Sequence, residues 1–138
     1  MAFSDMVIRE AGSNKASLIN CFNNLISSKF PLITPLFFVT PFITNLRGHI
    51  TELYITIRIE NKATGHVLNS VSGHIRFGPD GQDFEPEAVI DIPFPIPSFS
   101  IMEPGKYVVK VLVNNEEMGE RPLVVKSATQ AAAQIKEG

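Results

Sequence analysis

The chain has 138 residues, of which 44% are hydrophobic, and a formal net charge of −2. This length allows one domain that buries roughly two thirds of the surface of its unfolded chain, and the hydrophobic fraction is too high for a disordered chain. The lack of net basic charge argues against a nucleic-acid partner, while the single Cys21 excludes an intramolecular disulfide and suits a reducing compartment.

The sequence shows no targeting or membrane segment. Residues 1–10 lack a basic region followed by an apolar run, so they do not predict a secretory signal. The most apolar window, residues 30–43, is too short to cross a bilayer and contains Pro31, Pro35 and Pro41. These patterns predict a cytoplasmic protein without a membrane partner.

Strand patterns begin close to the N-terminus. Residues 3–9 and 16–22 predict the first two strands, and residues 23–29 are polar enough for a loop or a single helical turn. Because proline removes a backbone donor, the apolar window that follows is expected to contain a strand only at residues 36–40.

Residues 52–60 form the clearest predicted strand, because apolar and polar side chains alternate with a period of two. The residues expected to face the core are Leu53, Ile55, Ile57 and Ile59, and those expected to face outward are Tyr54, Thr56, Arg58 and Glu60. A returning strand is predicted over residues 67–77, and a further strand over residues 87–94.

Residues 104–126 predict a β-hairpin. Apolar residues fall on one face of its first strand, at Tyr107, Val109, Val111 and Val113. Asn115–Glu116 can supply the reversal, and Arg121–Pro122 indicates a returning strand at an edge or near a bulge. Such a hairpin is not stable alone in water, so its apolar face must pack on other strands.

Roughly seven to eight short strands, frequent turn signals and no long helical period predict an all-β fold. The expected architecture is an antiparallel two-sheet β-sandwich with immunoglobulin-like character. It is expected to form a single domain over residues 1–126. Residues 127–138 are rich in Ala and Gln and lack an apolar face, so they predict a flexible C-terminal tail.

Several of these segments together carry a resemblance to a known family. They are the N-terminal strand, the turn ending at Lys15, the strand of residues 17–22, the run Pro104-Gly-Lys-Tyr-Val-Val-Lys-Val111, and the returning strand with Gly119 and Arg121-Pro-Leu-Val-Val125. Over residues 3–126 the chain resembles a bacterial family of small β-sandwich proteins of unknown function. In that pattern the hairpin turn often reads Asp-Gly, whereas this chain has Asn114–Asn115. The resemblance implies a bacterial β-sandwich and transfers no functional residue.

Acidic residues gather between Asp80 and Glu87, where a loop could supply oxygen ligands to Ca²⁺. The spacing is not that of an EF-hand, because Asp91 stands where the last glutamate would be. The favoured interpretation is a solvated loop whose charges discourage edge-to-edge association. No metal site and no cofactor is assigned.

The sequence contains no catalytic constellation. His49, His66 and His74 lack the spacing of a shared metal site, and we expect them to be solvent-exposed, with His49 and His66 in turns. Ser72 and His74 share a face of one predicted strand, but a nucleophile-elbow motif is absent. Cys21 is expected to be a small core residue. The prediction is therefore that the protein is not an enzyme, with an unrecognised hydrolase as the minor alternative.

Apolar residues crowd two proline-broken segments, residues 30–43 and 94–102. We expect most of them to close the ends of the sandwich, and the alternative is an exposed patch for a partner or a second copy. The residues assigned to this candidate interaction surface are Phe37, Phe38, Phe42 and Phe99. The predicted function is a structural module that binds a protein partner or itself; the alternative, a small-molecule or carbohydrate-binding sandwich, is disfavoured by the absence of Trp.

Overall fold

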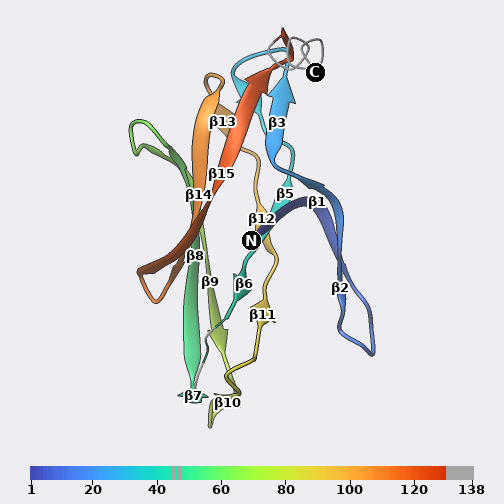
Figure 1. Cartoon of the computed structure of the whole chain (residues 1–138), viewed down its shortest axis with the longest axis vertical. Coiled ribbons are helices and arrows are strands. Elements are labelled where there is room, and N and C mark those ends of the chain that lie inside the picture. The colour runs from blue at the N-terminus through green and yellow to red at the C-terminus, as the bar shows by residue number, and fades with distance from the viewer. Residues whose placement is uncertain (45, 47, 130–138) are drawn as a thin grey trace.

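The computed structural model describes residues 1–44, 46 and 48–129. It is built of β-strands (Figure 1), and among the described residues only 128–129 have helical backbone. No helix in this part of the chain is long and apolar enough to cross a membrane. The strands are β1 (Ala2–Arg9), β2 (Ala16–Phe22), β3 (Asn24–Ser27), β4 (Leu32–Ile33), β5 (Phe37–Thr40), β6 (Phe42–Ile43), β7 (Gly48–Ile50), β8 (Glu52–Asn61), β9 (Val67–Arg76), β10 (Gln82–Phe84), β11 (Ile90–Asp91), β12 (Phe94–Ile96), β13 (Ser100–Ile101), β14 (Gly105–Val113) and β15 (Glu116–Ser127).

The strands form two larger and three small sheets in the described residues. The five-stranded sheet has the order β3-β15-β14-β8-β9, and the four-stranded sheet has the order β12-β5-β1-β2. The two-stranded sheets pair β10 with β7, β11 with β6 and β13 with β4. All pairs are antiparallel except β3 with β15. The all-β prediction is confirmed.

Strand β8 lies near the middle of the five-stranded sheet and follows the predicted alternation. Leu53, Ile55, Ile57 and Ile59 are at most 3% exposed, which confirms the predicted core face. The outward face has one exception. Glu60 was expected to be exposed, yet it is buried at 7% exposure, because Lys110 from the adjacent β14 lies against its carboxylate.

The predicted β14–β15 hairpin forms, but its reversal lies at Asn114–Asn115 rather than at Asn115–Glu116, because Val113 pairs with Glu116. Asn114 and Asn115 have φ angles of 52° and 66°, as required at both central positions of a two-residue turn matched to the strand twist. Tyr107, Val109 and Val111 of β14 are buried in the core. The register shifts between Val111 and Leu112, where β15 carries a bulge. β15 meets β3 only from Val124 onward, so its first half lies at the edge of the sheet.

One hydrophobic core joins the two larger sheets. It contains Ile55, Ile57 and Val109 from the five-stranded sheet, and Phe3 and Val39 from the four-stranded sheet. At one place in the core a large aromatic ring packs directly against a glycine. Because Gly73 of β9 has no side chain, the ring of Phe94 in β12 can approach its backbone closely.

Prolines separate the four-stranded sheet from the two-stranded sheet of β6 and β11. Pro41 separates β5 from β6, and Pro93 separates β11 from β12. β5 pairs with β12, and β6 pairs with β11 below them in the view of Figure 1. These breaks explain why the described residues contain more and shorter strands than the seven to eight expected.

Three further predictions of secondary structure need correction. Residues 24–27, expected in a loop or helical turn, form β3, because the edge of β15 offers them backbone partners. Residues 87–94 do not form one strand; only Ile90–Asp91 and Phe94 pair. The predicted tail begins inside β15 at Ser127, and its residues 130–138 lie outside the described part of the chain.

Candidate functional site

An apolar hollow opens between β6 and the first half of β15. Its volume is about 260 Å³, and Phe42, Ile43, Val111, Val113, Met118 and Glu120 are among the residues that line it. We call it the β6–β15 hollow. Val111 is buried, whereas Phe42 is 46% exposed and Met118 is 59% exposed. The hollow therefore has an apolar base on β14 and two large apolar side chains that solvent reaches.

Local structure explains why these side chains stay uncovered. β6 has a partner on one side only, β11, and the first half of β15 has a partner on one side only, β14, among the described residues. The bulge near Leu112 removes Met118 from the regular pairing. Because bulges bend and twist a strand, we attribute the separation of β15 from β6 to this irregularity.

The four aromatic residues predicted to form an interaction surface do not lie on one surface. Phe37 is fully buried, with its ring centroid 5.5 Å from Phe22 and 6.4 Å from Phe99. Its assignment to a surface is wrong, because the alternation of β5 turns Phe37 toward the core and Phe38 away from it. Phe38 and Phe99 are half-buried, and Phe42 alone of the four lines the β6–β15 hollow.

The sequence did not mark Met118 as a surface residue of interest, and it placed Val113 on the apolar face of a strand rather than at a hollow. Met118 lies among glutamates and glycine, so no local apolar pattern marks it. It becomes part of the site because it lines the same hollow as Phe42. The one signal available in the sequence was that Met118 is an apolar residue in the returning strand of the hairpin, which was predicted to lie at a sheet edge.

The β1–β2 hairpin carries a second group of exposed apolar side chains. Met6, Ile8 and Ile19 are 51%, 50% and 37% exposed. Met6 lies opposite Ile19 in the register, and Ile8 follows Met6 on the same face. Cys21 is also exposed on this hairpin. Its predicted core position is wrong, because the neighbouring Phe22 takes the inward position and contacts the rings of Phe3 and Phe37.

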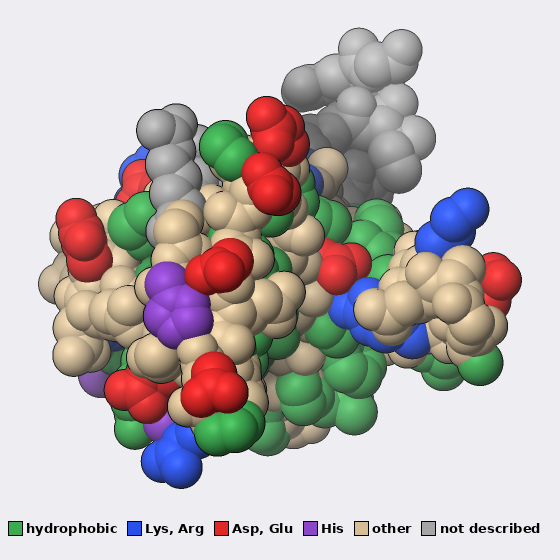
Figure 2. Space-filling view, turned by 90° about the horizontal axis from the view of Figure 1, so that it is seen from below, with side chains coloured by type: hydrophobic (Ala, Val, Ile, Leu, Met, Phe, Trp, Pro, Cys, Tyr) green, Lys and Arg blue, Asp and Glu red, His purple; other side chains and the backbone are tan. Residues whose placement is uncertain are grey.

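The predicted acidic loop forms part of a small sheet at one end of the molecule. Figure 2 shows this end, where acidic side chains project around a histidine. His49 lies in β7 rather than in a turn, and its Nδ1 is 2.8 Å from Asp83 Oδ1 in β10. Within the described residues, no group of three or more His, Cys, Asp or Glu side chains is placed to hold a metal ion.

Ser72 and His74 share one face of β9, but each of them contacts a different residue of β8. His74 Nε2 lies 2.9 Å from Glu52 Oε2, and its ring stacks on Tyr54 at 4.1 Å between centroids. Ser72 Oγ pairs instead with Thr56 Oγ1 at 3.1 Å. Both residues thus have cross-strand partners in β8, and the geometry described here is that of a polar sheet surface.

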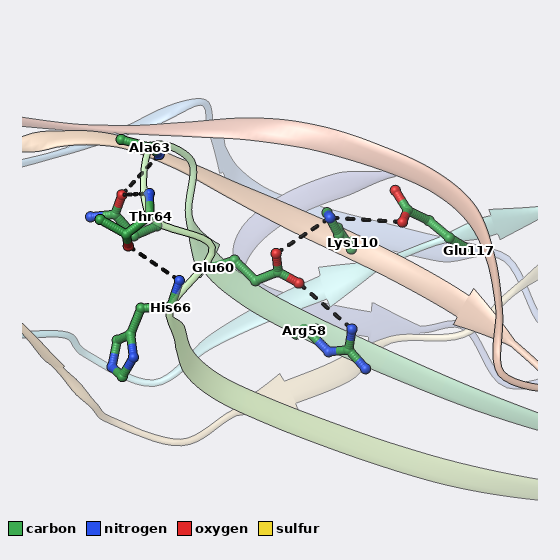
Figure 3. A network of polar contacts seen from close by, with 8 residues as sticks. Arg58, Glu60, Ala63, Thr64, His66, Lys110 and Glu117 are labelled. Carbon is green, nitrogen blue, oxygen red and sulfur yellow. Dashed lines mark hydrogen bonds and ion pairs between the residues drawn. The ribbon is translucent and has the colours of Figure 1, made fainter.

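A charged network joins β8, β14 and β15 beside this surface (Figure 3). Lys110 Nζ lies 3.3 Å from Glu60 Oε1 and 3.7 Å from Glu117 Oε2, and Arg58 approaches Glu60 at 3.7 Å. The hydrogen bond to Glu60 raises the pKa of Lys110, with the nearby glutamates acting in the same direction against desolvation. The network compensates the buried charge of Glu60.

A turn connects β8 to β9 directly after Glu60 and Asn61. Asn61 Oδ1 accepts hydrogen bonds from the backbone N–H groups of Ala63 and Thr64, and Thr64 Oγ1 accepts one from His66 N–H (Figure 3). His66 is exposed, as predicted. A second hollow, of about 340 Å³, lies beside this turn and Tyr107.

Comparison with known proteins places the chain in a family. The model of a family of unknown function (DUF6941) matches residues 1–126, which spans β1 to nearly the end of β15. No curated protein matches the chain. The match confirms the predicted resemblance to a family of unknown function. The chain therefore belongs to this family, DUF6941.

Proposed function

We propose that this protein is a non-enzymatic interaction module that binds a protein partner or a second copy of itself through exposed apolar β-structure. The observation that carries the proposal is the β6–β15 hollow, where Phe42 and Met118 remain 46% and 59% exposed. Grouped exposed apolar side chains are typical of interaction sites. The module is proposed to be an immunoglobulin-like two-sheet sandwich that works in the bacterial cytoplasm.

The first test measures self-association by size-exclusion chromatography with light scattering over a range of protein concentrations. A dimer that dissociates in the Phe42→Ser variant supports binding to a second copy. A monomer at all concentrations removes that version of the proposal and leaves a different protein as the partner.

The second test places a photo-crosslinking amino acid at position 42 in the producing cell. A defined crosslinked protein that is absent with the same group at position 102 supports the proposal. Met102 is a suitable control because it is 69% exposed and lies beside the other hollow. A monomeric protein that forms no crosslink specific to position 42 would contradict the proposed function.

The alternative proposal is a small-molecule or carbohydrate-binding protein. It is supported by the second hollow, which Asn61, Thr64, His66, Ser100, Glu103 and Tyr107 help to line. Several of its polar groups are already engaged, since the Tyr107 hydroxyl donates to the Glu103 carbonyl oxygen at 2.8 Å. A glycan array and a thermal-shift screen test this alternative, and an absence of any ligand in both would eliminate it.

A further inference from the structure

We propose that the β6–β15 hollow binds an extended, basic segment of another protein, which adds a strand beside β6 in line with β1. This inference rests on the proposed interaction function and specifies its partner. Addition of a strand to a free sheet edge is an established mode of peptide recognition, in which backbone hydrogen bonds supply affinity and alternate side chains supply specificity.

The register between β1 and β5 defines the position of the added strand. β1 runs antiparallel to β5, with Ala2 opposite Thr40 and Ser4 opposite Phe38. β6 continues the line of β5 after Pro41, so the line of β1, extended past Met1, runs along the free side of β6. Met1, Phe42 and Ile43 all line the hollow. Along Phe42 and Ile43 the described residues supply a strand partner only on the β11 side.

The base of the hollow determines the side chains that this strand would present. Val111 and Val113 lie two positions apart on β14, and both line the hollow. Successive side chains of a strand point to opposite faces, so every second residue of the bound segment would pack on these valines, between Phe42 and Met118. Valine, isoleucine or leucine at alternate positions would therefore fit.

The negative charge of β15 determines which residues suit the remaining alternate positions of the bound segment. Glu120 lines the hollow, and Glu116 and Glu117 precede it on the same edge strand. Glu117 pairs with Lys110, and Glu120 lies opposite the same lysine in the register, so one Lys110 serves both carboxylates, while Glu116 has no ion pair among the described residues. The cation nearest in sequence, Arg121, is engaged with the Met1 carbonyl oxygen and Asn23 Oδ1. Lysine or arginine in the partner would complement these carboxylates.

The same charges argue against the β15 edge of a second copy as the segment that binds in the hollow. The β15 edge of a second copy, placed beside β6 in the hollow, would bring its glutamates next to Glu116 and Glu120, and like charges on neighbouring strands are destabilising. The occupant that best fits the hollow is therefore a segment of a different protein with alternating basic and apolar residues.

The experiment measures binding of three fluorescent peptides to the full chain by anisotropy at low salt. The probes are Lys-Val-Lys-Val-Lys-Val-Lys with blocked ends, the analogue with Glu in place of Lys, and the analogue with Ser in place of Val. We expect the Lys-Val peptide to bind at least about tenfold more tightly than either analogue. Equal binding of all three would overturn the proposal.

Variants of the protein locate the binding site. Met118→Ser and Glu120→Lys should each weaken the Lys-Val peptide several-fold, and Glu120→Lys should improve binding of the Glu-Val peptide. Met102→Ser, which removes an exposed methionine outside the hollow, should bind as the unaltered protein does. Unchanged binding in both hollow variants would overturn the proposal, and thermal melts of each variant confirm that it is folded.

Two N-methylated forms of the Lys-Val peptide test the backbone pairing. Methyl groups on one set of alternate amides should abolish binding, while those on the other set should be tolerated, because only one edge of the added strand faces β6. Equal behaviour of the two forms would overturn strand addition.

The outcomes separate this inference from the proposed function. If no peptide binds the hollow but position 42 still crosslinks a partner, the interaction function stands and the basic-strand inference fails. If Phe42→Ser dissociates a dimer instead, the occupant is a second copy and the inference is likewise overturned.

Discussion

At the scale of single residues, Tyr107 shows how burial changes the chemistry of a side chain. It is 3% exposed, and its hydroxyl donates to the carbonyl oxygen of Glu103. Burial, followed by the nearby Glu103 carboxylate, raises the pKa of Tyr107 above its ordinary value of 10.0. The folded protein therefore holds this proton more tightly than the unfolded chain does. The contribution of Tyr107 to the free energy of unfolding is fully present below pH 10. It is lost as the pH rises from there through the pKa of Tyr107 in the folded protein.

This shift can be measured directly, because the chain has two tyrosines and no tryptophan. In the Tyr54→Phe variant, Tyr107 is the remaining tyrosine, and we expect its absorbance titration to have a midpoint above 10.0. The same variant in denaturant should titrate at the ordinary value. A folded-state midpoint at or below 10.0 would contradict the assigned burial effect.

At the scale of elements, the β1–β2 hairpin extends beyond the sheet that anchors it (Figure 1). β5 pairs with β1 only from Ala2 to Ser4, whereas β2 pairs with β1 as far as Arg9. The outer part of the hairpin is thus a two-stranded arm, and two-stranded ribbons are marginally stable. Arg9 ties the arm to the body, with Nη2 3.2 Å from Asp91 Oδ1 and 3.1 Å from the Asp91 carbonyl oxygen.

We predict that Arg9→Met loosens the arm without unfolding the protein. Partly exposed ion pairs contribute about 0–1 kcal/mol, so the melting temperature should change little. Hydrogen exchange of the arm amides, in residues 5–9 and 16–20, should become faster, while exchange in β8 and β14 stays the same. Arg76→Met serves as the control, and unchanged exchange in the arm would show that the contact with Asp91 does not hold it.

At the scale of the whole molecule, the two larger sheets fit together where Gly73 faces Phe94. A Cβ atom at position 73 would lie 2.8 Å from Cε1 and 3.2 Å from Cζ of the Phe94 ring. Phe94 is 6% exposed, so neighbouring side chains restrict its movement. The contact sets how closely β9 and β12 can approach.

Gly73→Ala should therefore destabilise the protein by about 1–3 kcal/mol, the usual cost of overpacking a core. Gly119→Ala, where a Cβ atom would meet no heavy atom within 4 Å, should change the free energy of unfolding by less than about 0.5 kcal/mol. In the Phe94→Leu background the Gly73→Ala change should cost less. An equal cost in both backgrounds, measured by chemical denaturation, would refute the contact.

The sequence predicted the fold best where one strand carried one regular alternation. The apolar positions of β8 were correct, and the hairpin reversal was placed within one residue of Asn114–Asn115, because strand period and turn conformation are local properties. Predictions failed where proline interrupted the pattern or where neighbours in space decided the outcome. Phe37 could not be distinguished from Phe38 until the register of β5 was known, and Glu60 is buried because Lys110 lies beside it.

The candidate site was predictable only in part. Phe42 belongs to an apolar segment for which exposure was the alternative to burial, and Met118 and Val113, which line the same hollow, come from a part of the chain more than 60 residues away. The amino-acid sequence by itself determined the class of fold and the position of the main strands, through alternation, turn residues and prolines. The tertiary structure decided which strand edges remain without a partner and which side chains meet there, because pairing between strands depends on the packing of the whole chain.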